Sequence, residues 1–136
     1  MFLNVLKDQN KELFLELCLH LSNSDGVFAD SEKEVLKAYC KEMEITEKTD
    51  FSMRPLENVV SILNNNANLV EKKIVIMELL ALAYVDGIYD ENEKEEMNII
   101  ISGLEFSENQ VKEIIELLNK YINICDEIKN YLCVEG

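Results

Sequence analysis

The chain has 136 residues, and its 13 basic and 27 acidic side chains give a formal charge of −14. A chain this acidic repels phosphate backbones and anionic lipid surfaces, which argues against a nucleic-acid partner. The length suits one domain, 1–136, and the four Gly and one Pro among many Leu, Ile, Glu and Lys favour helices over sheet.

In the first half of the chain, apolar residues at helical spacing predict a helix over 11–24. An Asp-Gly pair then ends it, since Gly can adopt the left-handed cap conformation. A second helix is expected from about 29 to 43, and Thr46 resembles the N-cap of another. Pro55 suits the first turn of a helix that runs to about Leu63. The Asn-rich residues 64–68 then predict a turn.

The second half repeats this order. A helix over 72–85 is apolar on most sides, so we expect it to be central and buried. It stops at a second Asp-Gly pair, and the next helix should run from about 90 to 103. Ser107 is a further candidate N-cap. The helix that follows it should run toward Tyr131, with or without a break near Cys125.

The two halves align without a gap. Residues 11–48 match residues 72–109 at ten of 38 positions, and each stretch carries an acidic decapeptide, DGVFADSEKE or DGIYDENEKE. Two copies are too few for a solenoid, so they should pack together. The predicted fold class is therefore all-α: a compact bundle of about six or seven helices, made of a duplicated helical unit with pseudo-two-fold symmetry.

The decapeptides do not match a conventional calcium loop. Placing Gly26 at loop position 6 puts Asp25 at position 5 and Glu32 at position 12, as an EF-hand requires. Position 1, however, is then Leu21 in the first copy and Leu82 in the second, and leucine cannot ligate through its side chain. We therefore exclude two ordinary EF-hand sites.

A site shared by the two copies is a different possibility. Asp25, Glu32, Asp86 and Glu93 flank two matching corners, and four converging carboxylates need a cation or raised pKa values. Ca²⁺ or Mg²⁺ would suit such oxygen ligands. In the alternative, the Asp residues bond only to their own turns, and the Glu residues only cap helices and offset the helix dipole.

The stretches SNSDGVFADSEKEVL and AYVDGIYDENEKEEM resemble the TerB-like (tellurite-resistance B) superfamily, and the resemblance covers roughly residues 11–125. It implies an all-α, internally pseudo-symmetric domain linked to tellurite resistance and other stress responses. It also implies an acidic cluster proposed to bind divalent metal, which falls on Asp25, Glu32, Asp86 and Glu93. The chain departs from the family at Ala29, where a capping Ser is frequent.

The cysteines and apolar segments indicate the cellular compartment of the protein. Cys18, Cys40, Cys125 and Cys133 form no CxxC pair, so a zinc site has little support, and the first two read as buried small hydrophobes. No secretory signal is evident, and the longest apolar stretch, interrupted by Glu78, is too short to span a bilayer. We expect a soluble, reduced, cytoplasmic protein that does not insert into membranes.

No catalytic signature is present: the chain has no Ser/His/Asp set, no Gly-rich phosphate loop and no metal-histidine motif. The lone His20 precedes core-like Leu21 and is interpreted as structural. Two non-enzymatic functions result. The first is a stress-associated domain whose acidic cluster binds a divalent cation or a basic partner. The alternative is a metal-free protein-interaction module, such as a co-chaperone or membrane-complex adaptor, with an unknown protein partner and acidic motifs that act as helix caps.

Overall fold

The structure, a computed structural model, describes residues 2–22, 30–45, 54–85 and 91–133. Within these ranges the chain contains helices and no strand, which confirms the all-α prediction. After a short 3-10 helix, η1, six α-helices follow in chain order: η1 (Leu3–Val5), α1 (Asp8–Ser22), α2 (Asp30–Glu42), α3 (Leu56–Asn66), α4 (Leu69–Val85), α5 (Glu91–Gly103) and α6 (Glu108–Cys133).

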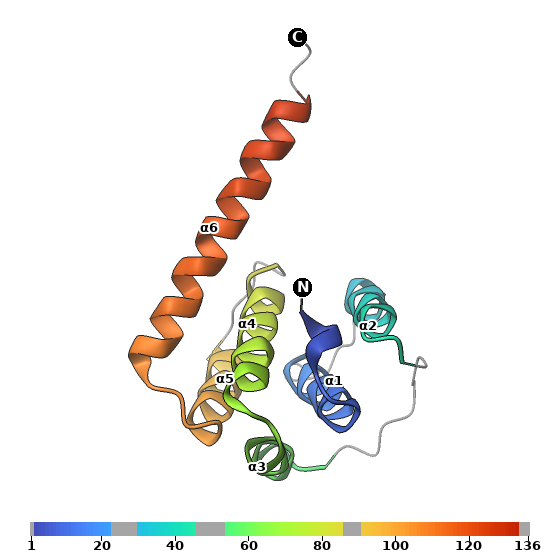
Figure 1. Ribbon diagram of the computed structural model, residues 1–136, viewed down its shortest axis with the longest axis vertical. Helices are drawn as coiled ribbons and strands as arrows, with labels where there is room; N and C mark the ends of the chain where they lie inside the picture. The colour runs from blue at the N-terminus through green and yellow to red at the C-terminus, as the bar shows by residue number, and fades with distance from the viewer. Residues whose placement is uncertain (1, 23–29, 46–53, 86–90, 134–136) are drawn as a thin grey trace.

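Helices α1 to α5 form the body of the molecule, and α6 leaves it (Figure 1). Helix α3 packs against both α1 and α5, α5 also packs against α1, and α4 carries most of the contact with α6. Phe14 of α1 meets Tyr39 of α2 edge to face, with ring centroids 5.3 Å apart. In α4, every residue from Glu71 to Leu82 except Lys73 is buried or half-buried, so the prediction of a largely buried central helix is confirmed.

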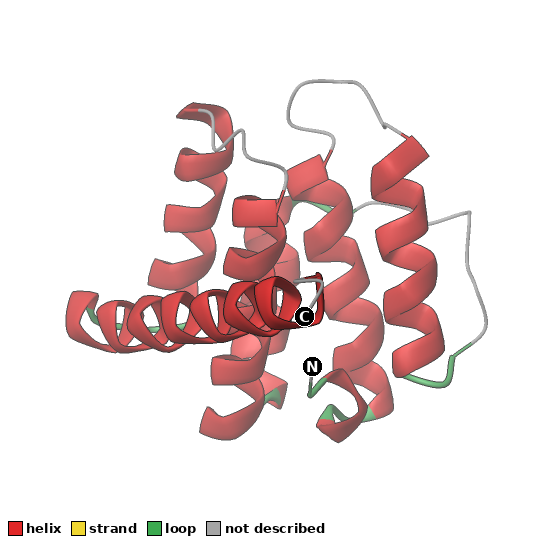
Figure 2. Cartoon of the chain, turned by 90° about the horizontal axis from the view of Figure 1, so that it is seen from above, coloured by secondary structure: helices red, strands yellow, loops and turns green. Residues whose placement is uncertain are grey.

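The bounds of the helices recur along the chain. Helices α1 and α4 begin at residues 8 and 69, and α2 and α5 begin at residues 30 and 91 and end at residues 42 and 103. Each of these pairs is separated by the same offset as the aligned sequence copies. Both α1 and α4 end, and both α2 and α5 begin, at the same end of the helical body (Figure 2). The four helix ends that flank residues 23–29 and 86–90 therefore lie at one end of the bundle.

The turns that end α2 and α5 are also alike. Glu44 and Glu105 adopt left-handed backbone conformations, with φ of 57° and 62°. In each turn the next residue donates its N–H to a carbonyl five residues earlier at 3.1 Å, from Ile45 to Cys40 and from Phe106 to Ile101. This is the hydrogen-bond pattern of a Schellman cap, in which glycine usually occupies the left-handed position.

Helix α5 approaches α3 closely at Gly103. A Cβ atom built on Gly103 would overlap Cγ1 of Val60, which is itself buried. The helices can pack at this distance only because residue 103 has no side chain. The last residue of α2 is Glu42, so α2 does not share this requirement.

Three local predictions can be compared with the structure. The turn over 64–68 is wrong for its first three residues: α3 continues to Asn66, because the buried Leu63 accepts a helical hydrogen bond from the N–H of Ala67 at 2.8 Å. Helix α6 runs unbroken past Cys125. Ser107 is confirmed as an N-cap, since its Oγ accepts from the N–H of Gln110 at 3.2 Å. Thr46 lies outside the described residues.

Among the helices of the described ranges, none combines the length and apolar character that a bilayer crossing requires.

Candidate functional site

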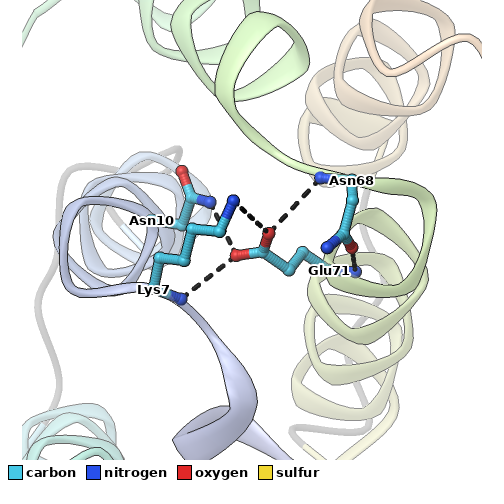
Figure 3. Close-up of polar contacts among 4 residues, drawn as sticks. All are labelled: Lys7, Asn10, Asn68 and Glu71. Atoms are coloured by element: carbon cyan, nitrogen blue, oxygen red, sulfur yellow. Dashed lines mark hydrogen bonds and ion pairs between the residues drawn. The ribbon is translucent and has the colours of Figure 1, made fainter.

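A buried, multiply hydrogen-bonded carboxylate, that of Glu71, lies in the first turn of α4 (Figure 3). Its Oε2 accepts a hydrogen bond from the side-chain amide of Asn10 at 2.7 Å and one from the backbone N–H of Lys7 at 3.1 Å. Its Oε1 accepts from the backbone N–H of Asn68 at 3.3 Å and lies 3.9 Å from the Lys7 ammonium. The residue is only 2% exposed, so water contributes little to the hydrogen bonding of this carboxylate.

Glu71 caps the N-termini of two helices, α1 and α4. Asn68 caps α4 directly, because its Oδ1 accepts from the N–H of Glu71 at 2.9 Å, and Glu71 bonds back to complete a capping box. Lys7 precedes α1 in the way that Asn68 precedes α4, but a lysine side chain has no acceptor with which to cap. Glu71 supplies that acceptor from the other helix. The start of α1 is thus fixed to the start of α4.

The pKa of Glu71 reflects these bonds. Burial acts to raise it, since a carboxylate loses its hydration in the protein interior. The hydrogen bonds from Asn10, Lys7 and Asn68, together with the Lys7 ammonium, favour the charged form and outweigh burial. The pKa of Glu71 therefore lies below its ordinary value. A carboxylate with three donors and almost no exposure is a structural group, and it cannot serve as an accessible general base.

A second polar link joins α1 to the chain just before α3. Arg54 donates to both carboxylate oxygens of Glu16, through Nη2 at 2.6 Å and Nε at 3.3 Å. The Glu16 side chain is 7% exposed and that of Arg54 is 46% exposed, so the arginine brings positive charge to a buried carboxylate. Nε2 of His20 lies 2.7 Å from the carbonyl oxygen of Arg54. This contact agrees with the structural interpretation of the lone histidine.

Two of the four cysteines lie in the core, as predicted. Cys18 is fully buried and Cys40 is 5% exposed, and both are free thiols. Burial raises the pKa of Cys18, and the nearby Glu78 carboxylate and Cys40 raise it further. A thiol in these surroundings stays protonated and cannot attack a substrate at neutral pH. It therefore gives no support to a cysteine-based enzyme.

The predicted metal ligands lie only partly within the described chain. Glu32 and Glu93 are each the third residue of their helices, α2 and α5, but their side chains lie outside what the structure describes. Asp25 and Asp86 lie outside the described residues altogether. Among the groups that the structure does describe, no set of three or more His, Cys, Asp or Glu side chains is suited to hold a metal ion.

The sequence prediction missed the Glu71 network. One signal was available, because Asn68-Leu-Val-Glu71 has the spacing of a capping box at the start of an apolar helix. That spacing predicts the bonds between Asn68 and Glu71. It carries no information on Lys7 or Asn10, which lie 64 and 61 residues earlier in the chain and reach Glu71 only in the folded protein.

No protein-family model, curated protein or solved structure matches the chain.

Proposed function

We propose that this protein is a small, non-enzymatic, TerB-like domain of the cytoplasm, active in stress responses such as tellurite resistance. In this proposal it is a duplicated helical unit with pseudo-two-fold symmetry, and Asp25, Glu32, Asp86 and Glu93 bind a divalent cation or a basic protein surface. The observation that carries it is the matched placement of the helices at the two corners. Helices α1 and α4 start together at Glu71 and end at the same end of the body, where α2 and α5 begin.

The recurring local structure supports the duplication. The start of α1 and both bounds of α2 return at the same offset in α4 and α5, and the same Schellman cap follows both α2 and α5. Glu32 and Glu93 therefore occupy the same position in matching helices that start at one end of the bundle. Four carboxylates gathered there would suit Ca²⁺ or Mg²⁺, because these hard cations take oxygen ligands. The chain as a whole, with its net charge of −14, would also attract a cation or a basic partner.

The proposal is tested by titrating the metal-stripped protein with Ca²⁺, Mg²⁺, Mn²⁺ and Zn²⁺ in a calorimeter and by following its thermal midpoint. We expect binding of Ca²⁺ or Mg²⁺ and a midpoint that rises with ion concentration. The double variant Asp25→Asn, Asp86→Asn should lose both effects. A matched control removes the same charge from exposed positions of α1 and α6, Asp8→Asn with Asp126→Asn, and should keep them. An unchanged response in the corner variant would refute the site.

A second candidate is the metal-free interaction module, whose acidic residues cap helices. It is favoured by the caps that the structure describes: both Asn68 with Glu71 and Ser107 with Gln110 form reciprocal capping boxes at helix starts. This function predicts no heat with any of the four ions. It also predicts that replacing Glu93 with Ala lowers the midpoint by the same amount with and without ions, since a lost cap does not depend on metal.

A further inference from the structure

Helix α6 carries one continuous apolar stripe that the body of the molecule covers only at its beginning. The stripe follows a strict heptad, with residues alternately three and four positions apart: Val111, Ile114, Leu118, Tyr121, Cys125, Ile128 and Leu132. Ile114 and Leu118 are buried in the core, and Val111 packs against it. From Tyr121 onward the helix extends beyond the other helices (Figure 1). The exposed part of the stripe thus continues an interface that already exists within the chain.

The uncovered part is large and apolar. Of the twelve large apolar side chains that are exposed on the described residues, seven lie on α6: Leu117, Tyr121, Ile122, Ile124, Ile128, Tyr131 and Leu132. Tyr131 and Leu132, at its far end, are 81% and 74% exposed. Three of the seven, Tyr121, Ile128 and Leu132, belong to the stripe, and the other four occupy heptad positions that flank it. Single exposed apolar residues are ordinary on a monomer, but an exposed apolar seam with apolar flanks marks an interaction surface.

The charge on this segment differs from that of the rest of the chain. Residues 119–133 contain two lysines, Lys120 and Lys129, and two acids, Asp126 and Glu127, so the segment has no net charge. The whole chain carries −14, which would keep two copies apart if their bodies met. The neutral segment, held away from the acidic body, is where two copies can approach without that repulsion.

We propose that the exposed segment of α6, residues 119–133, packs against the same segment of a second copy of this chain. A seam with a period of 3.5 residues is complementary to another helix that carries the same seam, because side chains at the heptad positions of each helix fit between those of its partner. A two-fold pair of identical surfaces is also the commonest way in which soluble chains associate. A helix that lies on a membrane usually has a polar face rich in lysine or arginine, which this segment lacks.

The test is the molar mass of the intact protein by analytical ultracentrifugation over about a hundredfold range of concentration around the micromolar level. We expect a dimer that dissociates on dilution. Ile128→Glu places a charge in the seam and should weaken the dimer at least tenfold. Asn130→Glu adds the same charge to the opposite, exposed side of the same helix and should leave the dimer intact. Circular dichroism checks that both variants stay folded.

Three results would overturn the proposal. The first is a monomer at every concentration. The second is an equal loss of association in Ile128→Glu and Asn130→Glu, which would assign the effect to added charge and not to the seam. The third is a monomeric protein that sediments with neutral phosphatidylcholine vesicles and is released from them by Ile128→Glu. That result would make the stripe a lipid-binding surface.

Discussion

The Glu71 network makes a quantitative prediction, because one buried carboxylate serves the starts of two helices. We consider Glu71→Gln, which keeps the size of the side chain but removes its charge and replaces one of its two acceptor oxygens by a donor. Oε2 accepts two hydrogen bonds and Oε1 accepts one. If the remaining oxygen keeps the two bonds from Lys7 and Asn10, the new amide group faces the N–H of Asn68, and two donors oppose each other.

Hydrogen bonds to a charged group contribute about 1.5–3 kcal/mol each, and a buried donor left without an acceptor costs about 1–3 kcal/mol. One bond is lost, and the other two fall from the strength of bonds to a charged group to that of neutral bonds, which costs about 1 kcal/mol each. We therefore expect Glu71→Gln to lower the free energy of unfolding by about 3–5 kcal/mol at pH 7. Glu57→Gln is the matched control. Glu57 is also an acid in the first turn of a helix, α3, but it is exposed. It should lose only the interaction with the helix dipole, about 0.3–1 kcal/mol.

The dependence on pH follows from the direction of the pKa shift. The pKa of Glu71 is lowered in the folded protein, so its stabilising effect is fully present above the unfolded-state pKa. That effect is lost as the pH falls through the lower, folded-state pKa. The difference in the free energy of unfolding between wild type and Glu71→Gln should therefore be large at pH 7 and shrink toward pH 3.

Urea unfolding at the two pH values measures this difference, and hydrogen exchange of the Lys7 and Asn68 amides measures the two caps separately. Both amides should exchange faster in Glu71→Gln. The reasoning is refuted if Glu71→Gln costs no more than Glu57→Gln. It is also refuted if its cost is the same at pH 3 as at pH 7, or if the Asn68 amide keeps its protection.

Two further predictions concern the end of α5 and its counterpart in α2. Gly103→Ala should destabilise the fold by about 1–3 kcal/mol, because the added methyl group overlaps Val60. Val60→Ala should recover part of that loss in the double variant, and strict additivity in the urea-unfolding cycle would argue against the contact. Replacing Glu44 or Glu105 by Gly should instead stabilise the protein by about 0.5–1 kcal/mol each, because both residues hold a left-handed conformation that suits glycine. Thermal midpoints measure these gains, and a lower midpoint in both variants would contradict the assignment of the caps.

The sequence alone determined most of the local structure. Apolar periodicity predicted helices in the correct order, and the Asp-Gly pairs correctly separated α1 from α2 and α4 from α5. These features depend on neighbours within one or two turns, so they can be read along the chain. The same holds for the cap at Ser107.

The contacts within the candidate metal site depend on more than neighbouring residues in the sequence. The repeated Asp and Glu residues remain a prediction from spacing, because whether they meet depends on the distance between two corners and not on the sequence of either one. Glu71 shows that a correct local pattern can give an incomplete account of a residue's contacts. Its spacing from Asn68 indicates an ordinary capping box, yet Lys7 and Asn10 use the same carboxylate.

Only the tertiary structure decided which elements meet. It showed that one carboxylate joins the starts of α1 and α4 and that Gly103 lets α5 approach α3. It also showed that α6 extends beyond the other helices while its apolar stripe is still uninterrupted. A heptad stripe has the same sequence whether its own chain or another covers it. The physical reason is that burial and long-range hydrogen bonds are properties of pairs of elements, while helix formation and capping are properties of one.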